Sequence, residues 1–271
     1  MGDIDVKKPF FSIITVSFNA EDCIRETMVS TLDQDFIDFE IIVKDGLSKD
    51  STLKQIPEDP RIKVYSTGDK GIYNAMNQAV EYANGEYLIF MNCGDVFNSN
   101  DVLSKVHDFI VDGEEKKGIV IGDCYSKGLY KYQNGCTKRF KQYRCSGFAH
   151  QSMFFHKDVF EKLGAYDESY KVYADLELFM RTYASGMGIY YISYPICDYQ
   201  GGGFSAQKET KKLLDEDKKR MRKKYFTVSE RVKYFVMFHA TLPALRNFCE
   251  NDSTPQFIKK IYRNFSNIFN K

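Results

Sequence analysis

Hydrophobic runs alternate with helix-like segments over the first hundred residues. Four segments are expected to form strands, at residues 10–16, 39–43, 61–65 and 86–91, and the first is a continuous apolar run rich in β-branched residues. Helices are expected between them, at residues 21–32, 48–56 and 72–83, and the last has one apolar face made of Ile72, Met76, Ala79, Val80 and Ala83. Continuous apolar runs are typical of parallel strands that are covered on both faces. The alternation therefore predicts an α/β fold with a Rossmann-like parallel sheet.

The later pattern is less regular but still mixed. Asn84-Gly85 is expected to cap the helix before it in a left-handed conformation. Beyond residue 100, helices are expected at 102–111, 173–185 and 208–224, and strands at 118–125, 152–156 and within 188–199. Residues 126–147 lack a clear period and predict a hairpin and a loop over a cleft. Three glycines at 201–203 suggest a hinge or a mobile flap. We therefore expect a catalytic domain over residues 1–205 and a basic helical extension over residues 206–271.

Charge is distributed unevenly along the chain. The net charge is +1, but residues 208–271 hold 16 Lys and Arg against 7 Asp and Glu. The tail is expected to end in an amphipathic helix at residues 256–269, which favours either an anionic membrane surface or a solvated helical face. Both alternatives stay open. The basic residues form no recognisable nucleic-acid-binding motif, so nucleic acid is not an expected partner.

Cysteine usage and the N-terminus favour a cytoplasmic protein. The seven cysteines are scattered and form no CxxC pair, so the sequence suggests neither a zinc site nor a disulfide framework. The first residues, MGDIDVKK, contain no apolar run of the kind that a signal peptide needs. We expect a cytoplasmic location, with the inner face of the membrane as an additional possibility.

Polar residues follow the early strands where each strand ends. They are Ser17 and Asn19, then Asp45, then Asp69 and Lys70, and then Asn92 and Asp95. The carboxyl ends of parallel strands lie side by side, and open α/β folds bind ligands there. The alternative is that such residues make turns or cap helices, which we prefer for Asp50 because it precedes a helix start. For Asp45 and Asp95 together we favour ligand binding.

Four segments together resemble the inverting family-two nucleotide-sugar glycosyltransferases, which have the GT-A fold. The segments are FSIITVSFN, DGLSKDST, DKGIYNAMNQAVEYANGEYLIFMNCGD and GAYDESYKVYADLELFMR, in that order within residues 10–203. The set is more specific than any one segment. The similarity is greatest to bacterial enzymes that build surface polysaccharides and lipid-linked oligosaccharides. It implies a Rossmann-like, mostly parallel sheet flanked by helices, with a C-terminal helical extension.

The resemblance implies a nucleotide site at the strand ends. Val16 and Phe18 take the place where the end of the first strand holds the nucleotide. Asp45 matches a carboxylate that accepts a hydrogen bond from the base ring N–H, which favours uracil or thymine over cytosine. Lys70 matches a basic position near the base and the diphosphate.

The same resemblance places a reduced metal motif at residues 92–95. This segment takes the place of a DxD-type motif, but only Asp95 keeps a carboxylate. Asn92 is expected to hydrogen-bond a ribose hydroxyl. A Mg²⁺ or Mn²⁺ ion held by Asp95, waters and donor phosphates is physically acceptable. This arrangement predicts weak metal binding in the absence of donor.

Asp175 takes the place of the family's general base. Ala174 replaces the Glu that precedes it in the family, and Glu177 lies two residues on. Helical positions two apart point about 200° away from each other, so both carboxylates cannot face one sugar hydroxyl. We expect Glu177 to pair with Arg181 instead. The alternative for Asp175 is charge complementarity with the helix N-terminus.

His150 and Gln151 are weaker candidates for contact with acceptor or phosphate. They precede an expected strand and follow a loop without clear period. A lone His is more often structural. We therefore include them only as secondary candidates.

Together these residues imply an inverting, hexosyltransferase-like enzyme of cell-envelope polysaccharide biosynthesis. It would move a sugar from a nucleotide-diphosphate donor, with a UDP-sugar expected, to a saccharide or lipid-linked acceptor. Asp175 would act as the base, and a metal near Asp95 with Lys70 would neutralise the diphosphate. The alternative is a non-catalytic nucleotide-sugar-binding or assembly subunit, suggested by the reduced metal motif and Ala174. A nucleotidyltransferase is disfavoured because SFNAEDC lacks a Gly-, Arg- and Lys-rich loop after the first strand.

Overall fold

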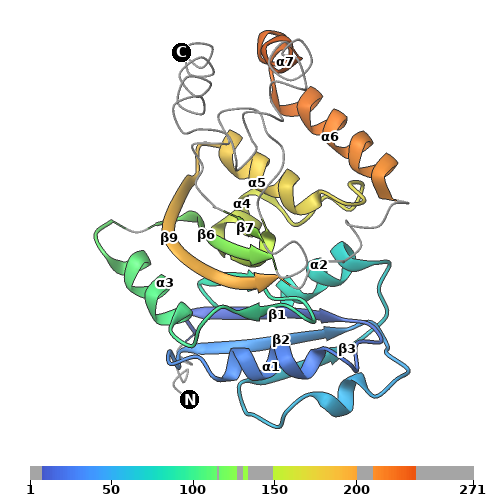
Figure 1. Ribbon diagram of the computed structural model, residues 1–271, viewed down its shortest axis with the longest axis vertical. Coiled ribbons are helices and arrows are strands. Elements are labelled where there is room, and N and C mark those ends of the chain that lie inside the picture. Colours follow the sequence, from blue (N-terminus) through green and yellow to red (C-terminus); the bar gives the residue numbers. More distant parts are fainter. Residues whose placement is uncertain (1–7, 115, 127–130, 134–148, 200–209, 236–271) are drawn as a thin grey trace, which may run out of the picture. The chain divides into compact units, whose positions relative to one another are not determined.

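The computed structural model describes residues 8–114, 116–126, 131–133, 149–199 and 210–235 (Figure 1). The chain divides into two compact units, of which the first comprises Met1–Cys136 with Gly147–Asp217 and the second Thr137–Ser146 with Lys218–Lys271. The expected domain boundary at residues 205–206, the glycine hinge at 201–203 and the tail helix at 256–269 lie outside the described residues. Most of the expected loop at 126–147 lies outside them too.

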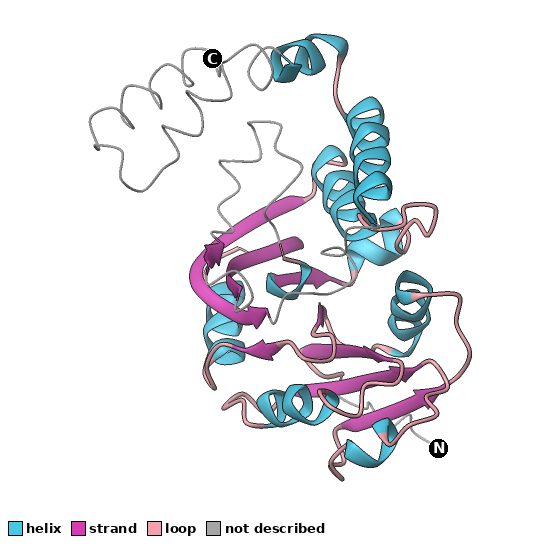
Figure 2. Cartoon of the chain, turned by 45° about the vertical axis from the view of Figure 1, so that its right-hand side comes forward, coloured by secondary structure: helices cyan, strands magenta, loops and turns pink. Residues whose placement is uncertain are grey.

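One mixed sheet organises the first unit (Figure 2). Its described strands are β1 (Phe11–Ser17), β2 (Phe39–Asp45), β3 (Ile62–Ser66), β4 (Tyr87–Phe90), β5 (Val96–Phe97), β6 (Gly118–Ser126), β7 (Lys131–Gln133), β8 (Met153–His156) and β9 (Gly188–Tyr199). They follow the order β3-β2-β1-β4-β8-β6-β9-β5, with β7 paired to β6. Strands β1 to β4 pair in parallel, whereas β8 is antiparallel to both β4 and β6. The predicted α/β fold is confirmed, and its parallel part is the one that the early alternation predicts.

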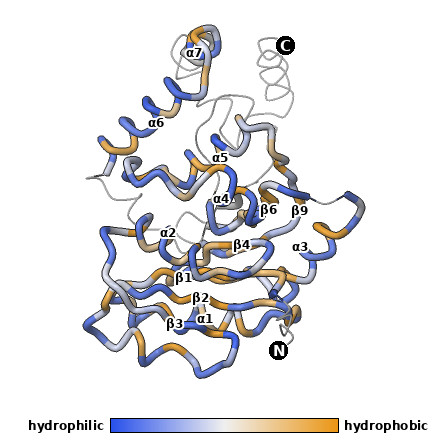
Figure 3. Tube along the Cα trace, turned by 180° about the vertical axis from the view of Figure 1, so that it is seen from behind, coloured by the Kyte–Doolittle hydropathy of each residue, from blue (hydrophilic) through white to orange (hydrophobic). Residues whose placement is uncertain are grey.

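Helices are found in both units. In the described residues they are α1 (Ile24–Leu32), α2 (Ile72–Tyr82), α3 (Val102–Val111), α4 (Asp158–Leu163), α5 (Ala174–Ala184), α6 (Lys211–Tyr225) and α7 (Val228–Phe235), with 3-10 turns η1 (Thr52–Gln55) and η4 (His150–Ser152). Helix α6 is hydrophilic along most of its length, in contrast to β1 and β2 (Figure 3). In the described part of the chain, no helix combines the length and the apolarity that a membrane crossing requires.

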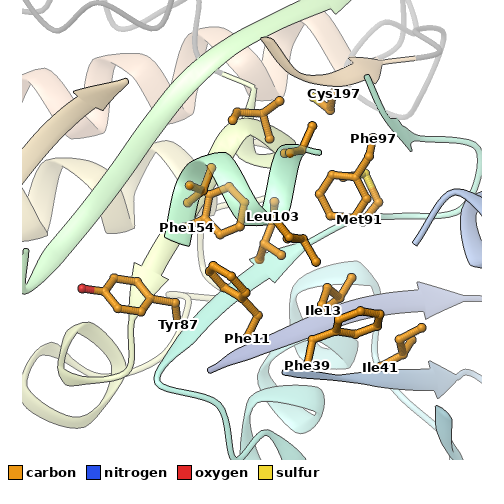
Figure 4. Close-up of a cluster of buried hydrophobic side chains, with 14 of the residues drawn as sticks. Phe11, Ile13, Phe39, Ile41, Tyr87, Met91, Phe97, Leu103, Phe154 and Cys197 are labelled. Atoms are coloured by element: carbon orange, nitrogen blue, oxygen red, sulfur yellow. The ribbon is translucent and has the colours of Figure 1, made fainter. Parts of the chain in front are cut away.

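The main hydrophobic core covers one face of the sheet (Figure 4). It joins Phe11 and Ile13 of β1 to residues of β2, β4 and β8 and to the buried sides of α1 and α3. Helix α2 packs on β1 and β2 with Ala75, Met76 and Ala79 buried outside this cluster. Strand β1 is therefore buried along its whole length, as a continuous apolar run predicts.

The segment expected as a helix at residues 48–56 is a single 3-10 turn, η1. Several of its backbone N–H groups donate to nearby side chains, which hold the segment in turns. The N–H of Ser48 donates to Asp45 and that of Lys49 to Asn19, at 2.9 Å each. Asp50 accepts the N–H of Thr52 at 3.0 Å, so the preferred interpretation of Asp50 as a turn or cap residue is confirmed.

The end of α2 also differs from its prediction. Ala83 has extended backbone angles, and neither Asn84 nor Gly85 has a positive φ, so the predicted left-handed cap is wrong. Gly85 instead allows a close approach to β1. A Cβ atom at this position would lie 2.5 Å from the backbone nitrogen of Ser12.

Residues 188–199 form one long, strongly curved strand, β9 (Figure 1). Its parallel pairing with β6 shifts register around Asp123, which is where a bulge adds curvature. Near its end, β9 pairs with β5, in the register Val96 to Asp198. Because β5 begins directly after Asp95, this pairing fixes the backbone that follows residues 92–95.

Candidate active site

Asp45 joins the ends of three neighbouring strands. Its carboxylate accepts hydrogen bonds from the hydroxyls of Ser17 at 3.1 Å, Ser48 at 2.5 Å and Ser66 at 2.8 Å, and from the Ser48 N–H at 2.9 Å. The side chain has no exposed surface. Burial disfavours the charged form of Asp45, but these hydrogen bonds outweigh it and lower the pKa below its ordinary value. A ligand that reaches this carboxylate must take the place of one of these donors.

Lys44 is a buried cation that the sequence analysis did not single out. Its ammonium donates to the carbonyl oxygens of Asp45 at 3.1 Å and Thr67 at 2.7 Å, and pairs with Asp69 at 3.3 Å. It therefore holds the loop before α2 against the end of β2. The available signal was a lysine directly after the apolar residues 41–43 of β2. Lys70, the predicted phosphate contact, is exposed, and its backbone N–H donates to Asn74 at 3.0 Å.

Phe18 and Val16 differ in what they can offer a nucleotide. The Phe18 ring is 64% exposed and lies beside Gly46, whose missing Cβ would be 3.3 Å from it. Val16 is buried, and its carbonyl accepts the Cys93 thiol at 3.5 Å. Leu47 follows Gly46 with a φ of 65° and is also exposed. Phe18 and Leu47 thus present apolar surface at the strand ends, whereas Val16 lines the core.

Residues 92–95 form a tight turn that is fastened to α1. The Thr27 hydroxyl accepts the Gly94 N–H at 2.9 Å and donates to the Asp95 carbonyl at 2.9 Å. Gly94 has a φ of 92°, a conformation that favours glycine. This explains why glycine occupies a position that the resemblance expects to be acidic. The Asp95 side chain is 5% exposed and accepts the Gln151 amide at 2.7 Å.

Asp175 lies at the N-terminus of α5 within a hydrogen-bonded chain of side chains. Its Oδ2 contacts His150 Nδ1 at 3.2 Å, and His150 Nε2 contacts the Asn92 amide nitrogen at 3.0 Å. Its Oδ1 accepts the Leu176 N–H at 2.8 Å and contacts the Tyr73 hydroxyl at 3.3 Å. Both the Asp175 and the His150 side chains are 18% exposed. The structure therefore brings together Asp175, His150 and Asn92 from distant parts of the sequence.

Both secondary candidates contact residues of the predicted site. His150 contacts the expected base, and its neighbour Gln151 binds Asp95, the expected metal ligand. Adjacent residues of η4 thus connect the two carboxylates. The sequence pattern gave no sign of this connection, because it depends on β8 lying next to β4 in the sheet.

Glu177 points into a separate contact, as predicted. It is fully buried and pairs with Arg181 at 2.9 Å, which confirms the expected i,i+4 ion pair. Arg181 also donates to the carbonyls of Leu163 at 2.6 Å and Ala165 at 2.8 Å. Glu177 therefore helps to hold α5 against the loop after α4, and it takes no part in the hydrogen bonds around Asp175.

The start of α5 is fixed by a residue of α6 that the sequence analysis missed. The Asp217 carboxylate accepts the N–H of Val172 at 2.8 Å and that of Tyr173 at 3.2 Å. The carbonyl of Val172 in turn accepts the Tyr73 hydroxyl at 2.5 Å. Burial raises the pKa of Tyr73, with the Asp175 charge as the next cause, so this hydroxyl stays a donor.

Asp95 and Asn92 carry side-chain oxygen atoms of the kind that bind divalent cations. Among the described residues, no three His, Cys, Asp or Glu side chains gather closely enough to hold a metal alone. Asn92 Oδ1 is buried and has no hydrogen-bond partner within the described chain. An unpaired amide oxygen and a carboxylate are oxygen ligands of the kind that Mg²⁺ and Mn²⁺ take, with donor phosphates and water completing the shell.

Sequence comparisons connect the chain to known glycosyltransferases. A family model described as Glycosyl transferase family 2 matches residues 12–164. The PGL/p-HBAD biosynthesis glycosyltransferase of Mycobacterium bovis is 28% identical over 184 residues, which cover 65% of this chain and 71% of the relative. TuaG of Bacillus subtilis, a glycosyltransferase assigned to teichuronic acid biosynthesis, is 38% identical over 110 residues, which cover 39% of this chain and 43% of TuaG.

Solved structures show the same fold at low sequence identity. S. aureus TarS in complex with UDP-GlcNAc matches with a TM-score of 0.65 at 17% identity, covering 91% of this chain and 76% of that chain. The mannosyltransferase PcManGT from Pyrobaculum calidifontis, in complex with GDP-Man and Mn²⁺, matches with a TM-score of 0.59 at 15% identity, covering 97% and 85%. These likenesses confirm the expected GT-A fold.

Proposed function

This chain belongs to glycosyl transferase family 2, and from that premise we propose that it moves a sugar from a UDP-sugar donor to an acceptor hydroxyl with inversion. The observation that carries the proposal is the chain of contacts from Asn92 through His150 to Asp175. These contacts connect the edge of the sheet at which α/β folds bind ligands to the carboxylate of Asp175 on helix α5. A donor site and a base are the two parts that a single displacement needs.

The donor half of the proposed site lies at the ends of β1, β2 and β4. Phe18 offers an exposed ring for the base, and Lys70 offers an exposed cation for the diphosphate. The base ring N–H would donate to Asp45 in place of the Ser48 hydroxyl, which also accepts the Asn19 N–H at 2.8 Å. The backbone of Val16 and the Asn92 amide complete the proposed set.

A divalent cation is part of the proposal. Asp95 and the oxygen of Asn92 would hold Mg²⁺ or Mn²⁺ together with the donor diphosphate. When bound, the ion supplies charge stabilisation to the leaving diphosphate. A site with one carboxylate should hold the ion weakly until the donor adds its phosphates. One neighbour, PcManGT, was solved with GDP-Man and Mn²⁺, which supports but does not fix the choice of ion.

Asp175 is the proposed base. As the acceptor oxygen bonds to the anomeric carbon, the bond from that carbon to the phosphate oxygen breaks, and its electron pair leaves with the diphosphate. The proton of the acceptor hydroxyl passes to the Asp175 carboxylate. One displacement of this kind inverts the anomeric centre. Lys70 stabilises the charge on the leaving group.

The acceptor that we propose is a saccharide or a lipid-linked intermediate of the cell envelope. The names of the relatives support this choice, since TuaG is assigned to teichuronic acid biosynthesis. The basic residues of the tail support binding to an anionic membrane surface. The protein would then be a peripheral protein on the inner face of the membrane. We expect a hexose-type sugar, by the resemblance to hexosyltransferases of this family.

Thermal stabilisation by nucleotide sugars tests the donor. Purified full-length protein would be melted with UDP-, GDP- and dTDP-sugars, each with Mn²⁺ and with EDTA. We expect the largest rise in Tm with a UDP-sugar and Mn²⁺, because ligands stabilise the state to which they bind. No rise with any nucleotide sugar under either condition would refute the proposal.

Replacing Asp175 tests the base. Asp175→Asn keeps the shape but cannot take a proton, so transfer should fall about 100- to 10,000-fold while the donor-induced rise in Tm is retained. Asp108→Asn, an exposed carboxylate on α3, is the matched control and should transfer normally. Undiminished transfer by Asp175→Asn would remove this residue from the proposed chemistry. Donor binding without transfer by the unmodified chain would favour the non-catalytic alternative.

A further inference from the structure

We propose that His150 is a positioning residue that orients the Asp175 carboxylate and couples it to the donor site through Asn92. The proposal rests on the proposed function and extends it to a residue that the reaction itself does not consume. His150 lies in η4, between the strand end that carries Asn92 and the helix that carries Asp175. It touches both, and its two ring nitrogens have different partners.

The two contacts are compatible with a single neutral tautomer. The amide nitrogen of Asn92 can only donate, so His150 Nε2 accepts at 3.0 Å. The ring proton of neutral His150 is then on Nδ1, where it donates to Asp175 Oδ2 at 3.2 Å. A carboxylate can only accept, so this end of the chain is consistent as well. The orientation of the Asn92 amide therefore fixes the proton of His150.

If the oxygen and nitrogen of the Asn92 amide exchanged places, the hydrogen bond between His150 and Asp175 would be lost. With its oxygen toward the ring, Asn92 would require a proton on Nε2 of neutral His150. The Nδ1 lone pair would then face the Asp175 carboxylate, and two acceptors would meet. The present orientation leaves Asn92 Oδ1 buried and without a partner among the described residues. A donor hydroxyl or a cation that engages this oxygen would secure the orientation that His150 needs.

The two oxygens of Asp175 have different hydrogen-bond partners. Oδ1 accepts the Leu176 N–H, whereas the Tyr73 hydroxyl, 3.3 Å away, has its single proton in the shorter bond to the Val172 carbonyl. Oδ2 receives a hydrogen bond from His150. His150 occupies one lone pair of Oδ2 and leaves another for the proton of the acceptor hydroxyl. The function of His150 is to hold Oδ2 toward the acceptor side of the site.

The tautomer can be measured without turnover. Full-length protein labelled with ¹⁵N-histidine gives separate NMR signals for protonated and unprotonated ring nitrogens, and His150→Asn identifies the His150 signals by their loss. We expect Nδ1 to carry the proton in the unmodified chain, and Asn92→Leu to shift the Nε2 signal while the Nδ1 proton stays on its bond to Asp175. His107 on α3, which contacts neither residue, is the internal control. A proton on Nε2 in the unmodified chain would overturn the proposal.

Three substitutions separate positioning from packing. Asn places its amide nitrogen near the position of Nδ1, whereas Gln places it near that of Nε2. His150→Asn should keep kcat within ~10-fold, while His150→Gln and His150→Ala should lower kcat ~10- to 100-fold with the donor KM nearly unchanged. Equal kcat losses in all three variants, or full activity in His150→Gln, would contradict the proposal. If the unmodified chain transfers no sugar, the proposed function falls, and the NMR result still decides the coupling of Asn92 to His150.

Discussion

Asp45 shows how a buried charge is stabilised by neighbouring hydroxyls. Three serines on separate segments donate to it, and together with one backbone N–H they occupy both oxygens. The sequence marks Asp45 as a ligand contact, yet in the protein it also fastens β1, β2 and β3 at their ends. A residue of this kind contributes to stability whether or not a donor is bound.

Replacing Asp45 should therefore destabilise the fold. In Asp45→Asn, the new amide NH₂ group faces hydrogen-bond donors. The serine hydroxyls can turn to accept from it, but the backbone N–H of Ser48 cannot. The free energy of unfolding should therefore fall by about 2–4 kcal/mol. Because folding lowers the pKa of Asp45, the wild type gains this stability above the unfolded-state pKa of about 3.9 and loses it as the pH falls through the lower folded value. Urea unfolding at several pH values measures the difference.

The difference in unfolding free energy between the wild type and Asp45→Asn should become smaller at acidic pH. Asp108→Asn, which changes an exposed carboxylate, serves as the control and should leave the free energy of unfolding nearly unchanged. A gap between wild type and Asp45→Asn that widens below pH 4 would be inconsistent with this account.

At the scale of elements, the proposed base depends on a contact between two helices. Helix α6 supplies Asp217, which binds the last two N–H groups before α5 begins. These N–H groups belong to the free end of a helix and need an acceptor when they are buried. In the same loop, the carbonyl of Val172 accepts a hydrogen bond from the Tyr73 hydroxyl, which also contacts Asp175. The contact is thus placed to fix the direction in which α5 presents its first carboxylate.

Removing the Asp217 carboxylate should loosen the start of α5. Asp217→Ala leaves two N–H groups without their acceptor, and we expect a loss of about 1–3 kcal/mol in unfolding free energy together with lower kcat. Asp215→Ala removes an exposed carboxylate from the same helix and is the matched control. Urea unfolding and sugar transfer would be measured on both variants. Equal behaviour of the two would show that the Asp217 contact does not position α5.

For the whole molecule, the uneven charge suggests where the enzyme works. The excess of Lys and Arg lies after residue 207, in the part of the chain that follows the proposed catalytic residues. Basic residues near an anionic bilayer gain electrostatic attraction that salt screens. We propose that a tail of this composition draws the protein to the membrane surface that carries a lipid-linked acceptor.

Deleting residues 252–271 tests the role of the tail. The full chain should co-sediment with vesicles that contain an anionic phospholipid, and the truncated chain should bind at least ~10-fold more weakly, because the deleted segment holds four Lys and Arg against one Asp. Added salt should weaken the binding of the full chain. Vesicles of neutral phosphatidylcholine are the control. Equal sedimentation of both chains with anionic vesicles would contradict a membrane role for this segment.

The sequence alone determined the alternation of strands and helices and the family. Strand burial and helix faces leave a periodic pattern because they depend on neighbouring residues, and this is why the strands and the longer helices expected within residues 10–125 are present in the structure, whereas the helix at 48–56 and the cap at 84–85 are not. The Glu177–Arg181 pair was predictable for the same reason, since one helical turn separates its members.

Only the tertiary structure decided how the candidate residues meet. His150 is 58 residues from Asn92 and 25 from Asp175, and it reaches both because β8 inserts next to β4 in the sheet. The burial of Lys44, the saturation of Asp45 and the contact of Asp217 with α5 likewise depend on strand order and on packing between elements. Such contacts join segments that share no local periodicity, so no pattern along the chain records them.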